Sequence, residues 1–275
     1  ARHCIYGVDK NPMAVDLAKL SLWLATFATD HQFTFLDDKL KCGDSLVGLS
    51  LNQLTNATWE TDVQQGGLFA TPVQSAIEEY QAVREEIALA AEDQDYDWLV
   101  QLNQEAEALA LRIKNIGDMV VSAFFGGTTQ TSRRQKLQLV SEDIPRILSS
   151  EHAATERFGL VLNPLHWPVE FPEVFLRENS GFDIFVGNPP FLGGKKVSSH
   201  FGDRYLDWLD ATFPNSNLSA DIVAYFFRRA FSCVNEEGSI VFICTNTISQ
   251  GDTRETGLVN LIKTGAKIFY CTKRL

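Results

Sequence analysis

Short apolar runs alternate with longer amphipathic stretches along most of the chain. Residues 4–9, 39–44 and 182–187 have the length and apolar content of strands, and the last run is apolar enough for burial on both faces of a sheet. We expect further strands over 239–244 and 267–271, and helices over 13–28, 221–234 and 253–262. Strands that alternate with helices predict an α/β protein with a mostly parallel, doubly wound sheet.

A central block, residues 73–125, is dominated by Ala, Glu, Gln and Leu, and its apolar residues recur at near-helical spacing. This spacing predicts a two-helix hairpin that turns near 92–95 and packs outside the sheet. Residues 132–147 are expected to form another short helix or a linker. We therefore expect a helical insertion at 73–150 within the domain; a dedicated partner-binding arm is the alternative.

Four segments are expected to lack regular structure because of their composition. Residues 52–61 are rich in Asn and Thr, 163–175 are rich in Pro, 193–199 are rich in Gly, Lys and Ser, and 235–238 have the composition of a turn.

Composition narrows the class of protein. The chain has 275 residues, of which 45% are hydrophobic and 21% charged, and it has no uninterrupted apolar run long enough to span a membrane. Its net charge of −11 argues against a protein that simply coats nucleic acid, but it does not exclude a local groove on the protein that binds DNA. The five cysteines form no CxxC motif and no signal peptide is evident, which favours a cytoplasmic protein. Neither the cysteines nor the five histidines have the spacing of a metal site, so we expect no metal.

Polar residues follow three of the expected strands. Asp9, Asp44 and Asn188 each lie where a strand ends. Ligands of doubly wound sheets bind beyond the carboxyl ends of the strands, so these residues are candidates for a binding site.

The tetrad, defined here as Asn188, Pro189, Pro190 and Phe191, is the most specific chemical signal. The two prolines stiffen the turn and carry no N–H donors. The Asn188 side-chain carbonyl and the Pro189 backbone carbonyl then remain as fixed acceptors, which suits an exocyclic NH2 group. Phe191 offers an aromatic face on which a planar group can stack. The alternative is a plain Pro-rich turn after a strand.

The tetrad resembles the catalytic motif of the adenine-N6 DNA methyltransferases, which use S-adenosyl-L-methionine. Residues 7–12 with 18–24 are similar to their second motif and its helix, and 42–46 to their third. Residues 166–175 resemble a segment of large methyltransferases from restriction-modification systems. The resemblance implies a Rossmann-like methyltransferase core over 1–275, with double-stranded DNA as its partner, the target base flipped out of the duplex and the tetrad as its catalytic residues.

The resemblance also implies a cofactor site. Asp9 would bind the ribose hydroxyls, Asp44 would accept a hydrogen bond from the cofactor's adenine amine, Ser45 lies next to it, and Lys10 would lie along the adenine. The alternatives are a helix-capping acid for Asp9, a loop acid for Asp44 and a solvated lysine for Lys10. Asp221 is expected to cap the helix that it opens, and the resemblance also places it near the substrate pocket.

One family feature is missing from the sequence. The Gly-rich turn that would hold the methionine part of the cofactor should precede Asp9 by about twenty residues. We therefore expect an internal fragment, incomplete at both ends, that lacks the first strand, is inactive alone, binds the cofactor poorly and self-associates through an unpaired strand edge. Two other functions stay open: a methyltransferase that modifies a protein glutamine amide, and a non-catalytic scaffold or DNA-binding part.

Overall fold

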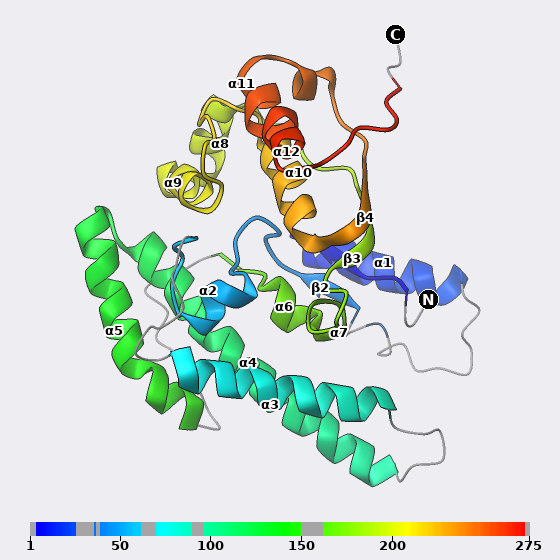
Figure 1. Ribbon diagram of the computed structural model, residues 1–275, viewed down its shortest axis with the longest axis vertical. Coiled ribbons are helices and arrows are strands. Elements are labelled where there is room, and N and C mark those ends of the chain that lie inside the picture. The colour runs from blue at the N-terminus through cyan, green and yellow to red at the C-terminus, as the bar shows by residue number, and fades with distance from the viewer. Residues whose placement is uncertain are drawn as a thin grey trace. The chain divides into compact units, whose positions relative to one another are not determined.

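The computed structural model describes residues 4–25, 36, 39–61, 70–89, 96–149 and 162–272. The chain divides into two compact units, Ala1–Arg177 and Glu178–Leu275, each with its own pair of parallel strands (Figure 1). The architecture is mixed α/β, as the alternation of apolar runs predicts.

The first unit combines two short strands with a group of helices. Its elements in chain order are β1 (Gly7–Asp9), α1 (Pro12–Ala25), β2 (Leu40–Cys42), α2 (Leu51–Thr55), α3 (Ala70–Leu89), α4 (Tyr96–Gly126), α5 (Gln130–Ser149), α6 (Trp167–Glu170) and α7 (Pro172–Phe175). β1 and β2 pair in parallel, with Gly7 opposite Leu40 and Asp9 opposite Cys42. Both strands are shorter than predicted. α1 begins at Pro12, as expected of a proline whose fixed φ suits the first helical turn.

The helical block forms where the apolar periodicity predicts it. α3 and α5 both pack against α4, and the predicted turn near 92–95 lies outside the described residues. The apolar stripes of the three helices are buried, and the buried side chains include Ile77, Tyr80, Val83, Ala106, Leu109, Ile113, Ile116, Val120, Val140 and Ile144. Burial of these stripes holds the block together, because each helix alone would leave its apolar face in water.

Two segments of the first unit that were predicted to be irregular are helical. α2 begins at Leu51 and covers the first part of the predicted loop 52–61, and Ser50 and Gln53 cap its start with a reciprocal capping box. The Pro-rich segment 163–175 contains the single-turn helices α6 and α7. Pro168 and Pro172 lie in the first turns of these helices, where a backbone N–H has no acceptor within the helix and proline therefore loses no hydrogen bond.

The second unit is built on a longer strand pair. Its elements are β3 (Phe182–Gly187), α8 (Gly194–Phe201), α9 (Asp203–Thr212), α10 (Ile222–Cys233), β4 (Val234–Phe242), the 3₁₀ turn η2 (Asn246–Ser249), α11 (Gly251–Arg254), the π-helical turn η3 (Glu255–Val259) and α12 (Asn260–Lys263). β3 has the predicted bounds. The expectation of a loop at 193–199 is wrong, since α8 covers 194–199, and the expected turn 235–238 is part of β4.

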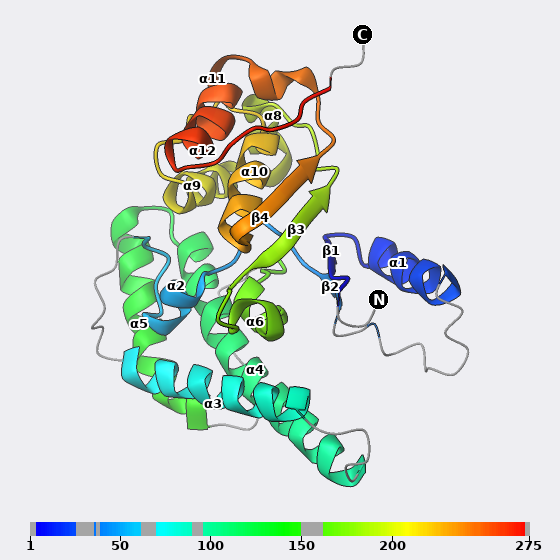
Figure 2. The ribbon, with the colours of Figure 1, turned by 45° about the vertical axis from the view of Figure 1, so that its right-hand side comes forward.

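β3 and β4 run parallel, with Val186 opposite Val241 (Figure 2). α10 packs on one face of this pair, where Phe227 meets Phe242 with a ring-centroid separation of 4.8 Å. The other face is exposed: the side chains of Ile184, Val186, Val241 and Ile243 are 63%, 71%, 52% and 73% exposed. The prediction that 182–187 is buried on both faces is therefore wrong for the described part of the chain.

The strand pairs form two separate parallel sheets within the described residues. A single doubly wound sheet is thus not seen, although parallel pairing and the alternation of strand and helix agree with the prediction. Residues 267–271, predicted as a strand, have no regular structure. Among the described helices, none is both long enough and apolar enough to cross a membrane.

Candidate functional site

Asp9 and Asp44 follow neighbouring parallel strands, so the structure brings them to the same edge. The Gly43 N–H donates to the Asp9 backbone carbonyl at 3.0 Å, which continues the strand pairing to the residue before Asp44. The Asp9 side chain is exposed, and its Oδ1 accepts a 2.7 Å hydrogen bond from the Asn11 N–H. An exposed carboxylate at the end of a strand can accept hydrogen bonds from the hydroxyl groups of a ligand.

Asp44 is more deeply placed than Asp9. Its residue is 4% exposed, Oδ1 accepts from the Leu46 N–H at 3.1 Å, and Oδ2 lies 2.8 Å from Lys10 Nζ. Lys10 thus forms an ion pair with Asp44 and differs from a fully solvated lysine, although half of its side chain is exposed. The four predicted cofactor residues, Asp9, Lys10, Asp44 and Ser45, all belong to this strand-end cluster.

A second segment, residues 163–167, lies along the loop that carries Asp44. The Asn163 carbonyl accepts from the Asp44 N–H at 2.8 Å, and the Asn163 amide donates to the Cys42 carbonyl at 2.7 Å. Trp167 Nε1 donates to the Ser45 carbonyl at 3.2 Å. The approach requires glycine at Gly48, since a Cβ there would lie 1.9 Å from a backbone oxygen of this segment. The cluster is thus fixed by residues more than a hundred positions away.

His166 joins the same loop to helix α4. Its Nδ1 accepts from the Leu49 N–H at 3.1 Å, so Nε2 carries the proton and donates to Asp118 Oδ1 at 3.2 Å. The imidazole is buried and packs against Gly117, where a Cβ would lie 2.6 Å from the ring. Burial lowers the pKa of His166 more than the Asp118 hydrogen bond and charge raise it. The neutral imidazole therefore joins the loop after Asp44 to α4 through one hydrogen bond on each ring nitrogen.

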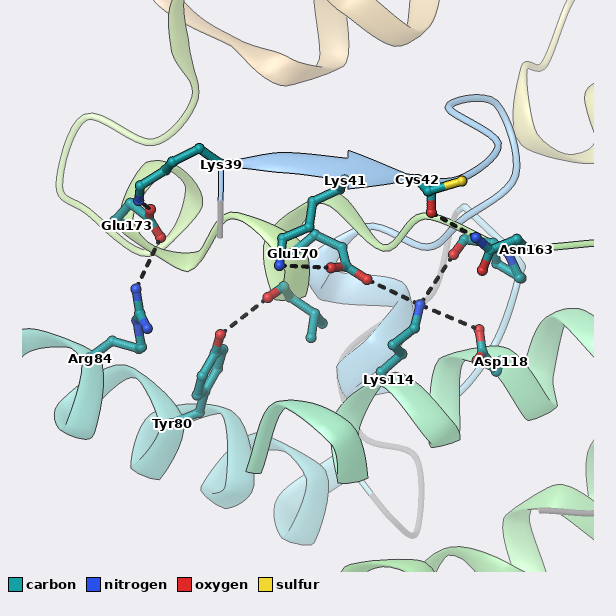
Figure 3. Close-up of polar contacts among 12 residues, drawn as sticks. Lys39, Lys41, Cys42, Tyr80, Arg84, Lys114, Asp118, Asn163, Glu170 and Glu173 are labelled. Carbon is teal, nitrogen blue, oxygen red and sulfur yellow. Dashed lines mark hydrogen bonds and ion pairs between the residues drawn. The ribbon is translucent and has the colours of Figure 1, made fainter. Parts of the chain in front are cut away.

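Two glutamates tie strand β2 to the helical block (Figure 3). Glu170 lies 3.7 Å from Lys41 of β2 and 3.1 Å from Lys114 of α4. Glu173 pairs with Lys39, next to β2, and lies 3.6 Å from Arg84 of α3. Each carboxylate thus bridges a lysine in or next to β2 and a cation of the helical block.

The environment of Glu173 supports a charged carboxylate. Burial alone would raise its pKa, but the hydrogen bond from Lys39 and the charges of Lys39 and Arg84 bring the pKa below its ordinary value. The same carboxylate affects Tyr6, whose pKa rises to about 12 through burial and the nearby negative charge.

The tetrad lies in the second unit, directly after β3. The Gly187 carbonyl accepts from the Ile243 N–H at 3.1 Å, which pairs the end of β3 with the chain leaving β4. Asn188 and Pro190 are exposed, Pro189 is buried, and Phe191 is 43% exposed. A buried proline between accessible Asn and Phe side chains leaves both free to meet a ligand from solvent.

A family model matches residues 3–264, nearly the whole chain: the Eco57I restriction-modification methylase model. The chain belongs to this family. The predicted resemblance to methyltransferases of restriction-modification systems is thereby confirmed at the level of the family.

A curated relative of this Eco57I-family methylase comes from Methanocaldococcus jannaschii and is named as a candidate type II restriction enzyme and methyltransferase. It is 23% identical over 221 residues, which cover 68% of this chain and 18% of the relative. The chain thus corresponds to less than a fifth of that protein's length. No solved structure matches the chain significantly.

Sequence reasoning on this Eco57I-family methylase missed several residues that position the site. Asn163, Glu170 and Glu173 carried no signal of their own; only the resemblance of 166–175 to a family segment marked the region. Their partners lie far away in the sequence, so spacing could not reveal them. Among the described residues, no group of three or more His, Cys, Asp or Glu side chains could hold a metal ion.

Proposed function

We propose that this Eco57I-family methylase transfers a methyl group from S-adenosyl-L-methionine to the exocyclic amine of adenine in double-stranded DNA. The single observation that carries the proposal is the tetrad at the carboxyl end of β3, with Asn188 exposed and Phe191 43% exposed. Family membership supports methyl transfer within a restriction-modification system.

The strand-end cluster has the chemistry to hold the nucleoside part of the cofactor. The exposed Asp9 carboxylate fits the ribose hydroxyls, and the Asp44 carboxylate with its Lys10 partner fits the polar edge of the adenine ring. Ser45 lies beside them. When bound, the cofactor supplies an electrophilic methyl group on a sulfonium.

The tetrad would act on the target amine. The Asn188 side-chain carbonyl and the Pro189 backbone carbonyl accept hydrogen bonds from the NH2 group, which increases electron density on its nitrogen. Phe191 stacks on the base once it is flipped out of the duplex. No covalent enzyme intermediate is needed, so positioning accounts for most of the rate increase.

The test is transfer of radiolabelled methyl by the full-length protein, with DNA and a release-factor protein offered as separate substrates. We expect label in DNA as N6-methyladenine. Label on a glutamine amide would favour a protein methyltransferase, and no label on either substrate would favour a non-catalytic scaffold.

Asn188→Ala should reduce transfer to DNA by about 30- to 1000-fold, because one fixed acceptor worth about 2–4 kcal/mol is lost. Asn103→Ala is the matched control, since Asn103 donates to the Leu99 carbonyl within α4 and is assigned no part in the reaction. The assignment fails if Asn188→Ala stays within about threefold of wild type.

A further inference from the structure

The backbone of the tetrad is anchored at both of its ends. At its start, the Gly187 carbonyl accepts from Ile243. At its end, Leu192, the residue after Phe191, donates its N–H to Asp221 Oδ1 at 3.1 Å and accepts from the Ile222 N–H at 2.9 Å. The two prolines between these anchors have no N–H to donate. The hydrogen bonds at the two ends therefore matter more for holding the tetrad backbone in place.

Asp221 has more than the capping role expected from the sequence. It caps α10, since its Oδ1 accepts from the Val223 N–H at 3.1 Å. The same oxygen accepts from Leu192, so one atom joins the helix start to the tetrad loop. The residue is 7% exposed, and its own N–H donates to Thr253 Oγ1 at 3.0 Å, which fixes Asp221 against α11. A buried acceptor held from both sides is a rigid anchor.

We propose that Asp221 is a positioning residue for the tetrad: its carboxylate holds Leu192 and thereby keeps the Asn188 acceptor and the Phe191 ring in place. This inference rests on the proposed function, because its catalytic consequence exists only if the tetrad receives the reacting amine. Asp221 itself accepts backbone N–H groups and is assigned no contact with the substrate.

The structural consequence can be measured without any reaction. In hydrogen exchange, Asp221→Ala should speed the exchange of the Leu192 amide, because that amide loses its acceptor. Asp221→Asn keeps a side-chain oxygen in place and should leave the exchange slow. Unchanged Leu192 exchange in Asp221→Ala overturns the proposal, whether or not the protein transfers methyl groups.

The catalytic consequence is a split between kcat and KM. In the full-length protein, Asp221→Ala should lower kcat by about tenfold or more, while KM for S-adenosyl-L-methionine changes by less than about twofold. The reason is that the residues assigned to the cofactor belong to the other unit of the chain. Asp221→Asn should restore kcat to within about threefold of wild type.

Asn235→Ala is the matched control for lost stability. Asn235 is 6% exposed, donates to Asp183 at 2.7 Å and accepts from the Glu237 N–H at 3.1 Å, at the opposite end of the β3–β4 pair. It should lower the melting temperature without changing kcat.

Three outcomes overturn the positioning role. They are an unchanged kcat in Asp221→Ala, an equal fall of kcat in Asn235→Ala, and a kcat of Asp221→Asn as low as that of Asp221→Ala. A wild-type protein that methylates nothing would instead defeat the proposed function, and the hydrogen exchange result would still decide the anchor.

Discussion

The ammonium group of Lys10 lies 2.8 Å from the carboxylate of Asp44, although the two residues follow different strands of one parallel pair. The pair is unequal, since the Lys10 side chain is 51% exposed and that of Asp44 is 5% exposed. The carboxylate is fixed by the fold, whereas the ammonium reaches it from solvent.

This inequality predicts that the two halves of the ion pair differ in their effect on stability. Lys10→Met should change the free energy of unfolding by less than about 1 kcal/mol, because the Lys10 side chain is half exposed and water screens its attraction to Asp44. Asp44→Ala should cost about 1–3 kcal/mol, since the buried Leu46 N–H loses its acceptor. Urea unfolding of both variants measures the difference. Equal losses would mean that the Lys10 contact contributes as much as the backbone hydrogen bond.

Phe191 is expected to act through stacking. Phe191→Ala should weaken methyl transfer mainly through a higher KM for DNA, because a stacked base is worth about 1–3 kcal/mol. Phe191→Tyr and Phe191→Trp keep an aromatic face and should be tolerated. Steady-state kinetics on a DNA substrate gives the comparison. A neutral Ala variant together with an inactive Trp variant would identify Phe191 as a packing residue.

His166 should make stability depend on pH. Its folded pKa is below the ordinary 6.5, so the unfolded chain takes up a proton that the folded protein resists. The free energy of unfolding should therefore be highest above pH 6.5 and fall as the pH decreases from 6.5 toward the folded pKa, by at most about 1.4 kcal/mol per pH unit. Urea unfolding from about pH 7.5 down to about pH 5 covers the window.

His166→Gln is the control for this titration. Its amide oxygen can accept from Leu49 and its NH2 group can donate to Asp118, but it does not ionise. The fall in stability below pH 6.5 should be smaller in this variant than in wild type. An identical pH dependence in both proteins would assign the effect to another group.

Glu170 should contribute more to the free energy of unfolding than an ordinary surface carboxylate does. Glu170→Gln removes the charge between Lys41 and Lys114, which are each only 25% exposed, and we expect a loss of about 1–3 kcal/mol. Glu78→Gln is the matched control, because Glu78 is exposed and accepts a 2.9 Å hydrogen bond from Gln74 within α3, and it should change stability by less than about 0.5 kcal/mol. If both variants unfold at the same urea concentration, the bridge contributes nothing measurable.

Local features of this fold were readable from the sequence where local physics decides them. The helical block follows from its apolar spacing, β3 from its continuous apolar run, and the start of α10 from Asp221. The prolines in 163–175 misled the prediction, because a proline ends a helix in its interior but suits its first turn.

Long-range features were not readable. The exposed face of β3 depends on which elements cover it, and an apolar run such as 182–187 does not encode its neighbours. The contacts of Asn163 with Cys42 and of Glu173 with Lys39 join residues that are 121 and 134 positions apart. Tertiary packing alone brings them together, whereas Asp9 and Asp44 were found because each lies at or near the end of a predicted strand.

The distance along the chain between Lys39 and Glu173 also sets an order of events during synthesis. The two residues are 134 positions apart, so a ribosome working at about 5–20 residues per second adds Glu173 roughly 7–27 s after Lys39. Until then, strand β2 and the Asp44 loop have left the ribosome without the segment that braces them. The β1–β2 pair is thus synthesised well before the segment that completes its packing, so this unit cannot close until Glu173 has been added.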